Sequence, residues 1–245
     1  MKIVNDINAE ELFELRKQLG WKDINIGQIK KGLKNTEYKI SIYEDDTMVA
    51  CGRIVSDYSF KGVLSDVMVN PDYQGKGYGK IVVTTLFKNV RDNLKVGEKY
   101  QIEATPTSGN RDFYVKCGMK YKPEVQDGTF LWIDKSLHKL HLLDKYFCLI
   151  KDGSKTVEIR LNDEKRKKMK VGNYIDFINK DTEEIVTTEI VDKKLFDSVN
   201  DLYDMYDEKS IGISKKDILK VMRNIYSEDE LNDNKICALE IKKIK

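Results

Sequence analysis

The chain has 245 residues, of which 40% are hydrophobic and 34% are charged. This is long enough for one large domain or two small ones, each with a real hydrophobic core. The charge is balanced, with 21 basic and 19 acidic residues over 1–136 and 22 of each over 137–245. A balance of this kind argues against broad, sequence-blind binding to nucleic acid or to an anionic membrane.

The sequence carries no mark of export or of membrane insertion. No apolar run approaches the ~20 residues needed to cross a bilayer, and the N-terminal stretch turns acidic at once, unlike a signal peptide. The four cysteines lie far apart and form no CxxC pair: Cys51, Cys117, Cys148 and Cys237. We therefore expect a cytoplasmic protein with reduced, buried thiols.

The first half predicts an α+β unit. Apolar residues recur at helical spacing in some segments and alternate in others, and glycine or proline follows several of them. The predicted elements are, in order, helices over 8–21 and 25–35, a hairpin over 38–56, a strand over 62–70, a glycine loop, a helix over about 77–94, a strand over 99–104, a short helix over 110–118 that ends at Gly118, and strands near Tyr121 and over 129–134.

The second half has a different pattern of predicted elements, and the boundary between the two halves falls near 134–138. Strands dominate its front part, which predicts a small barrel with attached helices. The predicted elements are a helix within 141–153, a strand over 155–161, a hairpin over 173–196, helices over 198–206 and 214–226, and a closing strand over 235–244.

The stretch "DYQGKGYGK" (72–80) holds three glycines before an apolar helix. The first N–H groups of a helix have no partner within it, and the helix dipole adds positive charge there, so such a start can bind a phosphate. Gly75, Gly77 and Gly79 would clear side chains from that site, and Lys76 and Lys80 would flank it. A tight turn before an ordinary helix is the alternative. The spacing fits neither the Walker loop nor the dinucleotide fingerprint.

The segment 64–83, "LSDVMVNPDYQGKGYGKIVV", resembles the central motif of the GNAT acyltransferases. That motif runs from a strand through Gln/Arg-x-x-Gly-x-Gly/Ala into a helix, and Gln74, Gly77 and Gly79 match it. The stretch "FYVKCGMKY" (113–121) is similar to the family's second motif, with Met119 in place of the usual aromatic residue. The resemblance implies a mixed central sheet flanked by helices over 1–135, and binding of acetyl-CoA.

Carried over by position, the resemblance assigns a role to each residue of these motifs. Met68 and Val69 would pair with the pantetheine amides, Phe113 would flank the CoA tail, and Tyr114 would protonate the departing thiolate. An ordinary core or surface tyrosine is the alternative for Tyr114. The pyrophosphate would be held by the backbone N–H groups of Gln74, Gly75, Lys76, Gly77, Tyr78, Gly79 and Lys80.

A general base is harder to assign. An acceptor amine with a pKa of about 10.4 must lose a proton near neutral pH, either to a carboxylate or to water. Asp66 and Glu103 lie on the two strands that would line the cleft, but each also fits a structural or solvated carboxylate. We assign no base from the sequence.

The segment 149–177 resembles the ASCH domain, a PUA-like β-barrel, and the likeness extends over 138–245. Its signature is close to Gly-x-Lys-x-x-Glu-x-Arg, which Gly153, Lys155, Glu158 and Arg160 match in order. The family is generally taken to bind RNA or nucleotides. Some small members hydrolyse an acetylated nucleoside with a Lys and a Thr three residues later. Here Glu158 occupies the Thr position, so we do not expect that activity.

Glu158 and Arg160 would lie on one face of a strand, where they could hold a base edge and a phosphate or ribose. A structural ion pair is the alternative. Lys155 could reach the same cleft, and Glu208 is a candidate third carboxylate. The basic run over 160–170 would form a phosphate-contacting rim or simply a solvated face. His138 and His141 have no acidic or Cys partner nearby, so we expect no metal site.

These observations support three hypotheses. The first is an acetyl-CoA-dependent N-acetyltransferase that acts on a primary amine, with an ASCH domain that recognises RNA or a nucleotide-linked substrate. The second is a small-amine, polyamine or detoxifying acetyltransferase with an independent ASCH module. The third is an RNA- or nucleotide-binding protein in which the acetyltransferase half senses CoA.

Overall fold

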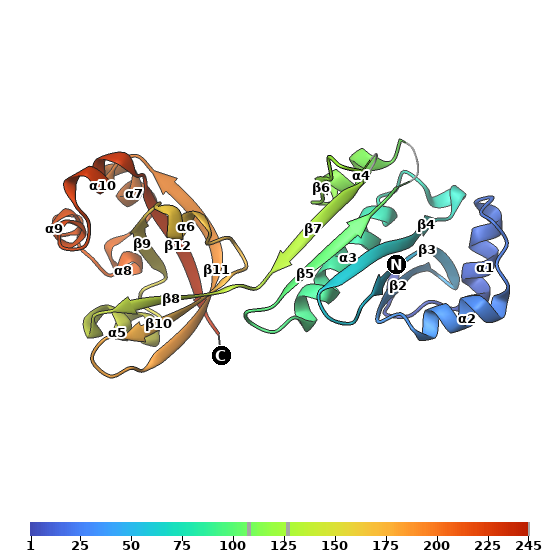
Figure 1. Cartoon of the computed structure of the whole chain (residues 1–245), viewed down its shortest axis with the longest axis horizontal. Coiled ribbons are helices and arrows are strands. Elements are labelled where there is room, and N and C mark those ends of the chain that lie inside the picture. The colour runs from blue at the N-terminus through green and yellow to red at the C-terminus, as the bar shows by residue number, and fades with distance from the viewer. Residues whose placement is uncertain (107–108, 126–127, 245) are drawn as a thin grey trace. The chain divides into compact units, whose positions relative to one another are not determined.

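The computed structural model describes residues 1–106, 109–125 and 128–244. The chain divides into two compact units, which we call unit 1 (Met1–Asp134) and unit 2 (Lys135–Lys245) (Figure 1). Each unit has its own sheet and its own hydrophobic clusters, so each is described by itself.

Unit 1 is built on one sheet with the strand order β1-β2-β3-β4-β5-β7-β6 among its described residues. Neighbouring strands are antiparallel except β4 and β5, which are parallel. The elements are β1 (Lys2–Val4), α1 (Ala9–Gln18), α2 (Ile26–Lys34), β2 (Tyr38–Glu44), β3 (Thr47–Ser56), β4 (Lys61–Val69), a 3-10 turn (Pro71–Tyr73), α3 (Tyr78–Asn93), β5 (Lys99–Ala104), α4 (Arg111–Lys116), β6 (Lys120–Tyr121) and β7 (Thr129–Asp134).

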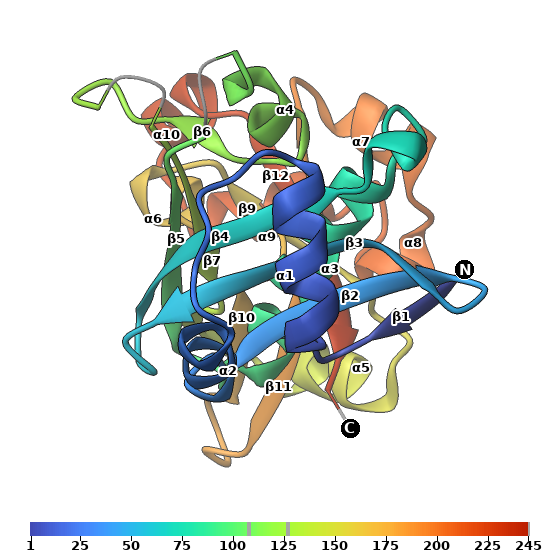
Figure 2. The same ribbon diagram turned by 90° about the vertical axis from the view of Figure 1, so that its right-hand side faces the viewer.

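Helices cover both faces of this sheet. α3 presents Val82, Val83 and Leu86, none of them exposed, to one face, and α1 and α2 pack on the other (Figure 2). Polar caps start two of these helices, since Asn8 accepts N–H bonds at the start of α1 and Asn25 does so for α2. The result is a three-layer mixed α+β unit.

β4 and β5 pair over only three residues each, Lys61–Val63 against Gln101–Glu103; β4 then continues to Val69 paired with β3 on one side and, among the described residues, with no strand on the other. The register between β3 and β4 shifts opposite Gly52, where Asp66 has a φ of 49°. Such a bulge bends a strand away from regular pairing. The two central strands therefore diverge, and the cleft described below lies where they part.

Unit 2 contains the sheet β8-β10-β11-β12-β9 in its described part, with β8 and β10 parallel and the other neighbours antiparallel. Its elements are β8 (Leu137–Leu142), α5 (Asp144–Asp152), β9 (Val157–Leu161), α6 (Glu164–Lys167), β10 (Tyr174–Asn179), β11 (Ile185–Phe196), α7 (Val199–Met205), α8 (Glu208–Ile211), α9 (Ile218–Arg223), α10 (Glu228–Asp233) and β12 (Ile236–Lys243).

This sheet curls into a half-barrel that stays open between its two edge strands, β8 and β9 (Figure 1). One cluster of buried side chains fills the curl between the strands and α5, and a second packs β9 and β12 against the helices that follow β11. We call the gap between β8 and β9 the seam. It matters because side chains of both edge strands point into one hollow there.

Several elements differ from those predicted. Leu137–Leu142 forms β8, whereas the sequence suggested a linker that runs into a helix; Leu140 and Leu142 are buried and the strand pairs with β10. The predicted helix over 214–226 is only Ile218–Arg223. β1, α6, α8 and α10 were not predicted; α6 and α8 are one turn long and β1 has three residues, too short for a periodic pattern to show.

Candidate functional site

A cleft of about 1110 Å³ opens in unit 1 beside the part of β4 that follows Val63, where β5 no longer pairs with it. It is lined by the end of β4, by the glycine loop and by α4. Ten of the predicted site residues line it together: Met68, Val69, Gln74, Gly75, Gly77, Tyr78, Gly79, Lys80, Phe113 and Tyr114. Lys76 does not; its ammonium donates to the carbonyl of Asp72 at 3.1 Å and lies 4.6 Å from the ring centre of Tyr73.

The glycines of the loop are required for two different physical reasons. Gly75 and Gly77 have φ of 75° and 89°, and a Cβ on either would meet nothing within 4 Å, so backbone conformation rather than space requires glycine. Gly79 is different, because a Cβ there would lie 3.2 Å from Cζ of Phe113. Gly79 thus allows α4 to approach α3, and it brings Phe113 to the wall of the cleft.

The start of α3 is a suitable anion site. Gly77 is its N-cap residue and provides no side-chain bond to the first N–H groups of the helix. Sixteen residues of helix follow, so the dipole is well developed. Together with the gap beside β4, these unfilled donors fit the diphosphate and the extended tail of acetyl-CoA. Gln74 stabilises the turn, since its amide donates to the carbonyl of Val69 at 3.2 Å.

Tyr114 lies in the cleft wall with its ring edge-on to Phe113, at 4.9 Å between ring centres. Burial raises the pKa of Tyr114 to about 12, and the neighbouring Cys117 thiol adds to the effect. A raised pKa keeps the phenol protonated through the neutral range. Tyr114 can therefore donate a proton at the cleft but cannot act as a base there.

Neither candidate base is free. Asp66 is held by the guanidinium of Arg16 at 2.8 Å and by that of Arg53 at 2.6 Å, and its side chain is 10% exposed. The Lys122 and Lys61 ammonium groups bind Glu103 at 3.0 and 3.1 Å and lower the pKa of its carboxyl. Both carboxylates are structural, and Asp66 is the one carboxylate among the described residues that line the cleft.

One part of the cleft wall was not predicted from the sequence. Leu19 and Trp21, from the segment between α1 and α2, also line the cleft. The guanidinium of Arg16 lies 5.0 Å from the ring centre of Trp21, which links this segment to the Asp66 pair on β4. No local motif marks these residues, because their place in the cleft depends on contacts between distant segments, such as that of Arg16 with Asp66.

In unit 2, Lys155, Glu158 and Arg160 form a chain of charges at the start of β9. The Lys155 ammonium lies 3.2 Å from the Glu158 carboxylate, which also pairs with Arg160. Their side chains are 2%, 1% and 13% exposed, respectively. Glu158 therefore takes part in a structural ion pair, the alternative considered from the sequence. Arg160 is the most exposed of the three side chains.

Lys155 is an anchor rather than a reactive amine. Besides Glu158, its ammonium donates to the carbonyls of Val157 at 2.8 Å and Ile211 at 2.5 Å, so three acceptors match its three N–H bonds. Burial lowers the pKa of Lys155, while the Glu158 carboxylate opposes that shift. The three acceptors hold the ammonium in place, and through them it ties β9 to α8.

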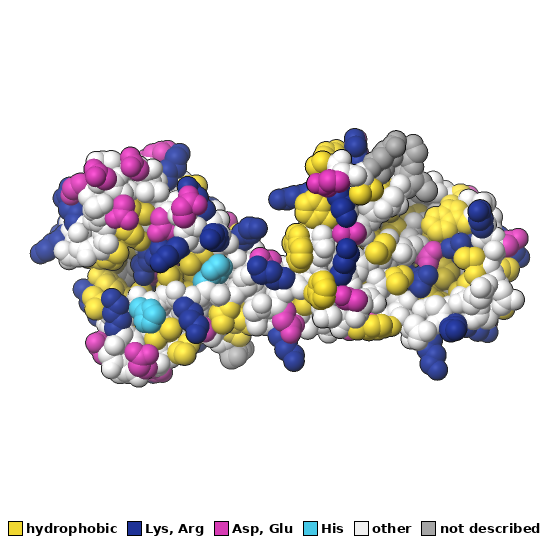
Figure 3. Space-filling view, in the orientation of Figure 1, with side chains coloured by type: hydrophobic (Ala, Val, Ile, Leu, Met, Phe, Trp, Pro, Cys, Tyr) yellow, Lys and Arg dark blue, Asp and Glu magenta, His cyan; other side chains and the backbone are white. Residues whose placement is uncertain are grey.

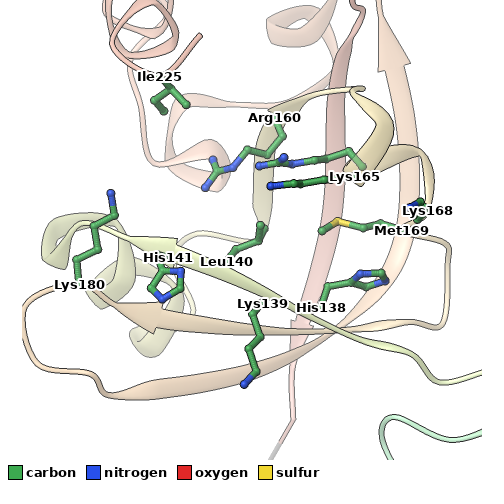
Figure 4. A pocket seen from close by; sticks show the side chains of 11 residues that line it. His138, Lys139, Leu140, His141, Arg160, Lys165, Lys168, Met169, Lys180 and Ile225 are labelled. Atoms are coloured by element: carbon green, nitrogen blue, oxygen red, sulfur yellow. The ribbon is translucent and has the colours of Figure 1, made fainter.

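Two adjoining hollows flank Arg160 at the seam. A basic hollow of about 450 Å³ is lined by cations from β8, β9, α6 and the end of β10 (Figure 4). A more enclosed and mainly apolar hollow of about 270 Å³, which we call the apolar hollow, lies next to it, against α9 and the residues that follow; Lys155, Glu158 and Arg160 all line it. His141, Arg160, Lys180 and Ile225 line both.

Of the other residues of unit 2 considered from the sequence, some line the basic hollow and others face solvent. His138, with its ring 3.1 Å from the Asn173 side chain, and His141 line the basic hollow. From the basic run, Lys165, Arg166 and Lys168 join them. Glu208 does not belong to either hollow; it is exposed and accepts from the backbone N–H of Lys215 at 2.8 Å, so its prediction as a pocket carboxylate is wrong.

Among the described residues, no three His, Cys, Asp or Glu side chains converge as metal ligands would. All four cysteines are free thiols, and Cys148 is exposed, unlike the buried thiol expected. In the same part of the chain, no helix has both the length and the apolar character that a membrane span requires.

Comparisons with known proteins match one family to each of the two units. Residues 3–119 match the model of the Acetyltransferase (GNAT) family, and residues 140–244 match the ASCH domain. An uncharacterized N-acetyltransferase, ycf52, of Pyropia yezoensis is 30% identical over 129 residues, which cover 51% of this chain and 72% of that protein. The histone acetyltransferase TAP1 of Glycine max is 26% identical over 140 residues, covering 51% and 57%.

A solved structure of a probable acetyltransferase from Staphylococcus aureus aligns with a TM-score of 0.46 and 24% identity, over 51% of this chain and 94% of that one. The GNAT family model falls on unit 1, which carries the cleft, and the ASCH match falls on unit 2. The chain therefore belongs to the GNAT acetyltransferases and joins an acetyltransferase unit to an ASCH domain.

Proposed function

We propose that the chain transfers the acetyl group of acetyl-CoA to a primary amine, and that its ASCH domain recognises RNA or a nucleotide-linked substrate. The observation that carries the first part is the start of α3, where uncapped N–H groups face the cleft beside the diverging strands. The diphosphate would bind there, and the thioester would extend along Met68 and Val69 toward Tyr114.

The reaction follows from these positions. The amine nitrogen attacks the thioester carbonyl carbon, a backbone N–H of β4 stabilises the oxyanion, and the C–S bond breaks. Tyr114 gives its proton to the departing thiolate and regains one from solvent. Because Asp66 and Glu103 are both held by cations, the proton lost by the amine leaves through water in the open cleft.

A polyamine acceptor fits the cleft less well than a monoamine. A polycation needs free carboxylates along its length, and the single carboxylate among the described lining residues is already neutralised by Arg16 and Arg53. Lys80 and Lys116 add positive charge to the same cleft. We therefore favour an acceptor that carries one amine, or one that also bears a negative charge.

Calorimetry with CoA, followed by thiol release from acetyl-CoA, tests the proposal. The acceptors would be monoamines, spermidine, aminoalkyl nucleotides and bulk tRNA. CoA binding with turnover on a monoamine or nucleotide-linked amine supports it. CoA binding without turnover on any acceptor would favour a CoA sensor, and preference for spermidine would favour the polyamine enzyme.

A further inference from the structure

We infer that the seam of unit 2 binds one phosphorylated nucleotide unit, with its phosphate among the cations of the basic hollow and its base in the apolar hollow. This rests on the proposed nucleotide recognition by the ASCH domain and states what the ligand must be. The shared chemistry is that of a nucleoside monophosphate or of the phosphorylated end of an RNA strand.

The charge of the basic hollow favours an anion. Figure 4 shows Arg160, Lys165, His141 and Lys180 around one space. In the space-filling view, dark blue side chains gather around the two histidines on this face (Figure 3). No Asp or Glu is among the described residues that line the hollow.

Arg160 is held in place before any ligand arrives. Glu158 pairs with its guanidinium, and Lys155 in turn holds Glu158. These three side chains carry two positive charges and one negative charge, so Arg160 still presents a net positive charge to the hollow. A fixed guanidinium loses little freedom on binding and can hold two phosphate oxygens at once.

The apolar hollow limits the size and nature of the rest of the ligand. Its walls include Tyr146, Ile218, Val221 and Tyr226, and the charged chain of Lys155, Glu158 and Arg160 forms one side of it. Its volume of about 270 Å³ lies just below the range for drug-sized ligands, which begins near ~300 Å³, so it can admit one planar ring system. Arg160 borders both hollows, so its planar group can face the ring while its N–H groups face the phosphate.

This arrangement differs from that of a surface that binds a continuous RNA strand. Such surfaces combine an extended positive groove with aromatic side chains that stack successive bases. Here the described residues form one small recess beside one basic hollow. The geometry therefore selects a terminal or free nucleotide rather than an internal stretch of RNA.

The test is calorimetric titration of the full chain with CMP, UMP, AMP and GMP, with the matching nucleosides, and with a short RNA that carries either a 5′-phosphate or a 5′-hydroxyl. Saturating CoA is present throughout, because CoA itself contains a nucleotide and its own cleft could bind AMP. We expect at least one monophosphate or the 5′-phosphorylated RNA to bind at least tenfold more tightly than its unphosphorylated partner.

Lys180→Ala and Lys165→Ala are exposed changes that should fold normally, and each should weaken that binding several-fold. Arg160→Ala should weaken it at least tenfold, with Arg160→Lys as the variant that keeps the charge. Lys216→Ala is the matched control, because Lys216 is exposed and lines neither hollow, and this variant should bind as the native chain does.

Equal binding of nucleotides and nucleosides would overturn the inference, as would failure of every phosphorylated probe. Tighter binding of an unphosphorylated RNA than of any monophosphate would overturn it in favour of an RNA track. These outcomes are independent of the acetyltransferase proposal, whose own readouts, CoA affinity and thiol release, are measured on the same protein preparation.

Discussion

Burial, rather than a neighbouring carboxylate, determines the protonation of Tyr114. Its ring packs against Phe113 and the core of unit 1, and the pKa of its phenol rises to about 12. For an acidic group a raised pKa favours the protonated form in the folded chain. The associated stability is present below the unfolded pKa of about 10 and is lost as the pH rises toward 12.

Tyr114→Phe should lower the rate of acetyl transfer by about 100-fold or more, because it removes the proton donor and keeps the ring. CoA affinity should stay within about twofold, since the phenyl group still packs on Phe113. Thiol release and calorimetry with CoA measure the two quantities. Tyr78→Phe is the control, because Tyr78 lines the same cleft but bonds to Glu44 at 2.6 Å. Equal losses in both variants would remove Tyr114 from the reaction.

The pH dependence of kcat/KM should also reflect the raised pKa of Tyr114. The acceptor amine must be neutral to attack, so kcat/KM should rise with pH up to the amine pKa of about 10. The proton donor stays protonated up to a pKa of about 12, so we expect no descending limb below about pH 10. Rates on one monoamine between pH 6 and 10 check this. A fall in rate between pH 7 and 9 would mean that a different acid protonates the thiolate.

At the scale of elements, the glycine loop and α3 act together, because the helix supplies the N–H donors and the loop leaves them uncapped. Gly77→Glu should abolish CoA binding, since it places a carboxylate and a strained backbone at the diphosphate site. Gly97→Glu is the matched control: its φ of 95° imposes the same backbone strain, and it lies between α3 and β5, outside the cleft. The proposed diphosphate site would be wrong if both variants bound CoA equally, as measured by calorimetry.

The charge chain at the start of β9 should contribute strongly to the stability of unit 2. Lys155→Met would leave Glu158 buried with one fewer partner and would free the carbonyl of Ile211, so we expect a loss of about 3–5 kcal/mol. Lys151→Met, which removes an exposed pair with Glu184, should cost less than about 1 kcal/mol. Urea unfolding of both variants measures the difference. Similar midpoints would mean that the buried pair does not stabilise the fold.

Much of both units can be predicted from the sequence because the signals are local. The helix over 77–94 and the hairpin over 38–56 follow from periodicity and turn residues, and the structure places α3, β2 and β3 there. Gly75 and Gly77 are likewise visible, because left-handed backbone needs glycine. Local signals fail for β8, which is defined by its pairing with β10, about 35 residues farther along the chain.

The site was harder to predict wherever it depends on distant partners. From the sequence, Asp66 is a possible base, but in the structure Arg16 and Arg53 bind its carboxylate. From the sequence, Trp21 is the end of a predicted helix, but in the structure it lines the cleft. Arg160 was identified from its motif, but its position between two hollows depends on the open seam of the barrel, which no spacing in the sequence reveals.

At the scale of the whole molecule, the division at Asp134 gives each unit a complete core and its own cleft. Unit 1 should therefore fold alone and acetylate a free amine at the rate of the full chain. Cooperative thermal unfolding of 1–134 and thiol release measure this. If the truncated chain failed to fold, Arg160→Ala in the full chain would take its place, because it disables the seam and leaves unit 1 intact.

The two units should cooperate when the acceptor carries both of their ligands. If the ASCH domain presents the acceptor, an aminoalkyl RNA with a 5′-phosphate should react with the full chain at a kcat/KM at least tenfold above that of the same alkylamine free. Tethering raises the local concentration of the amine without any new contact. Truncation to 1–134, or Arg160→Ala, should reduce the tethered substrate to the rate of the free amine and leave the free amine unchanged. An unchanged ratio after either alteration would show that the two units act independently.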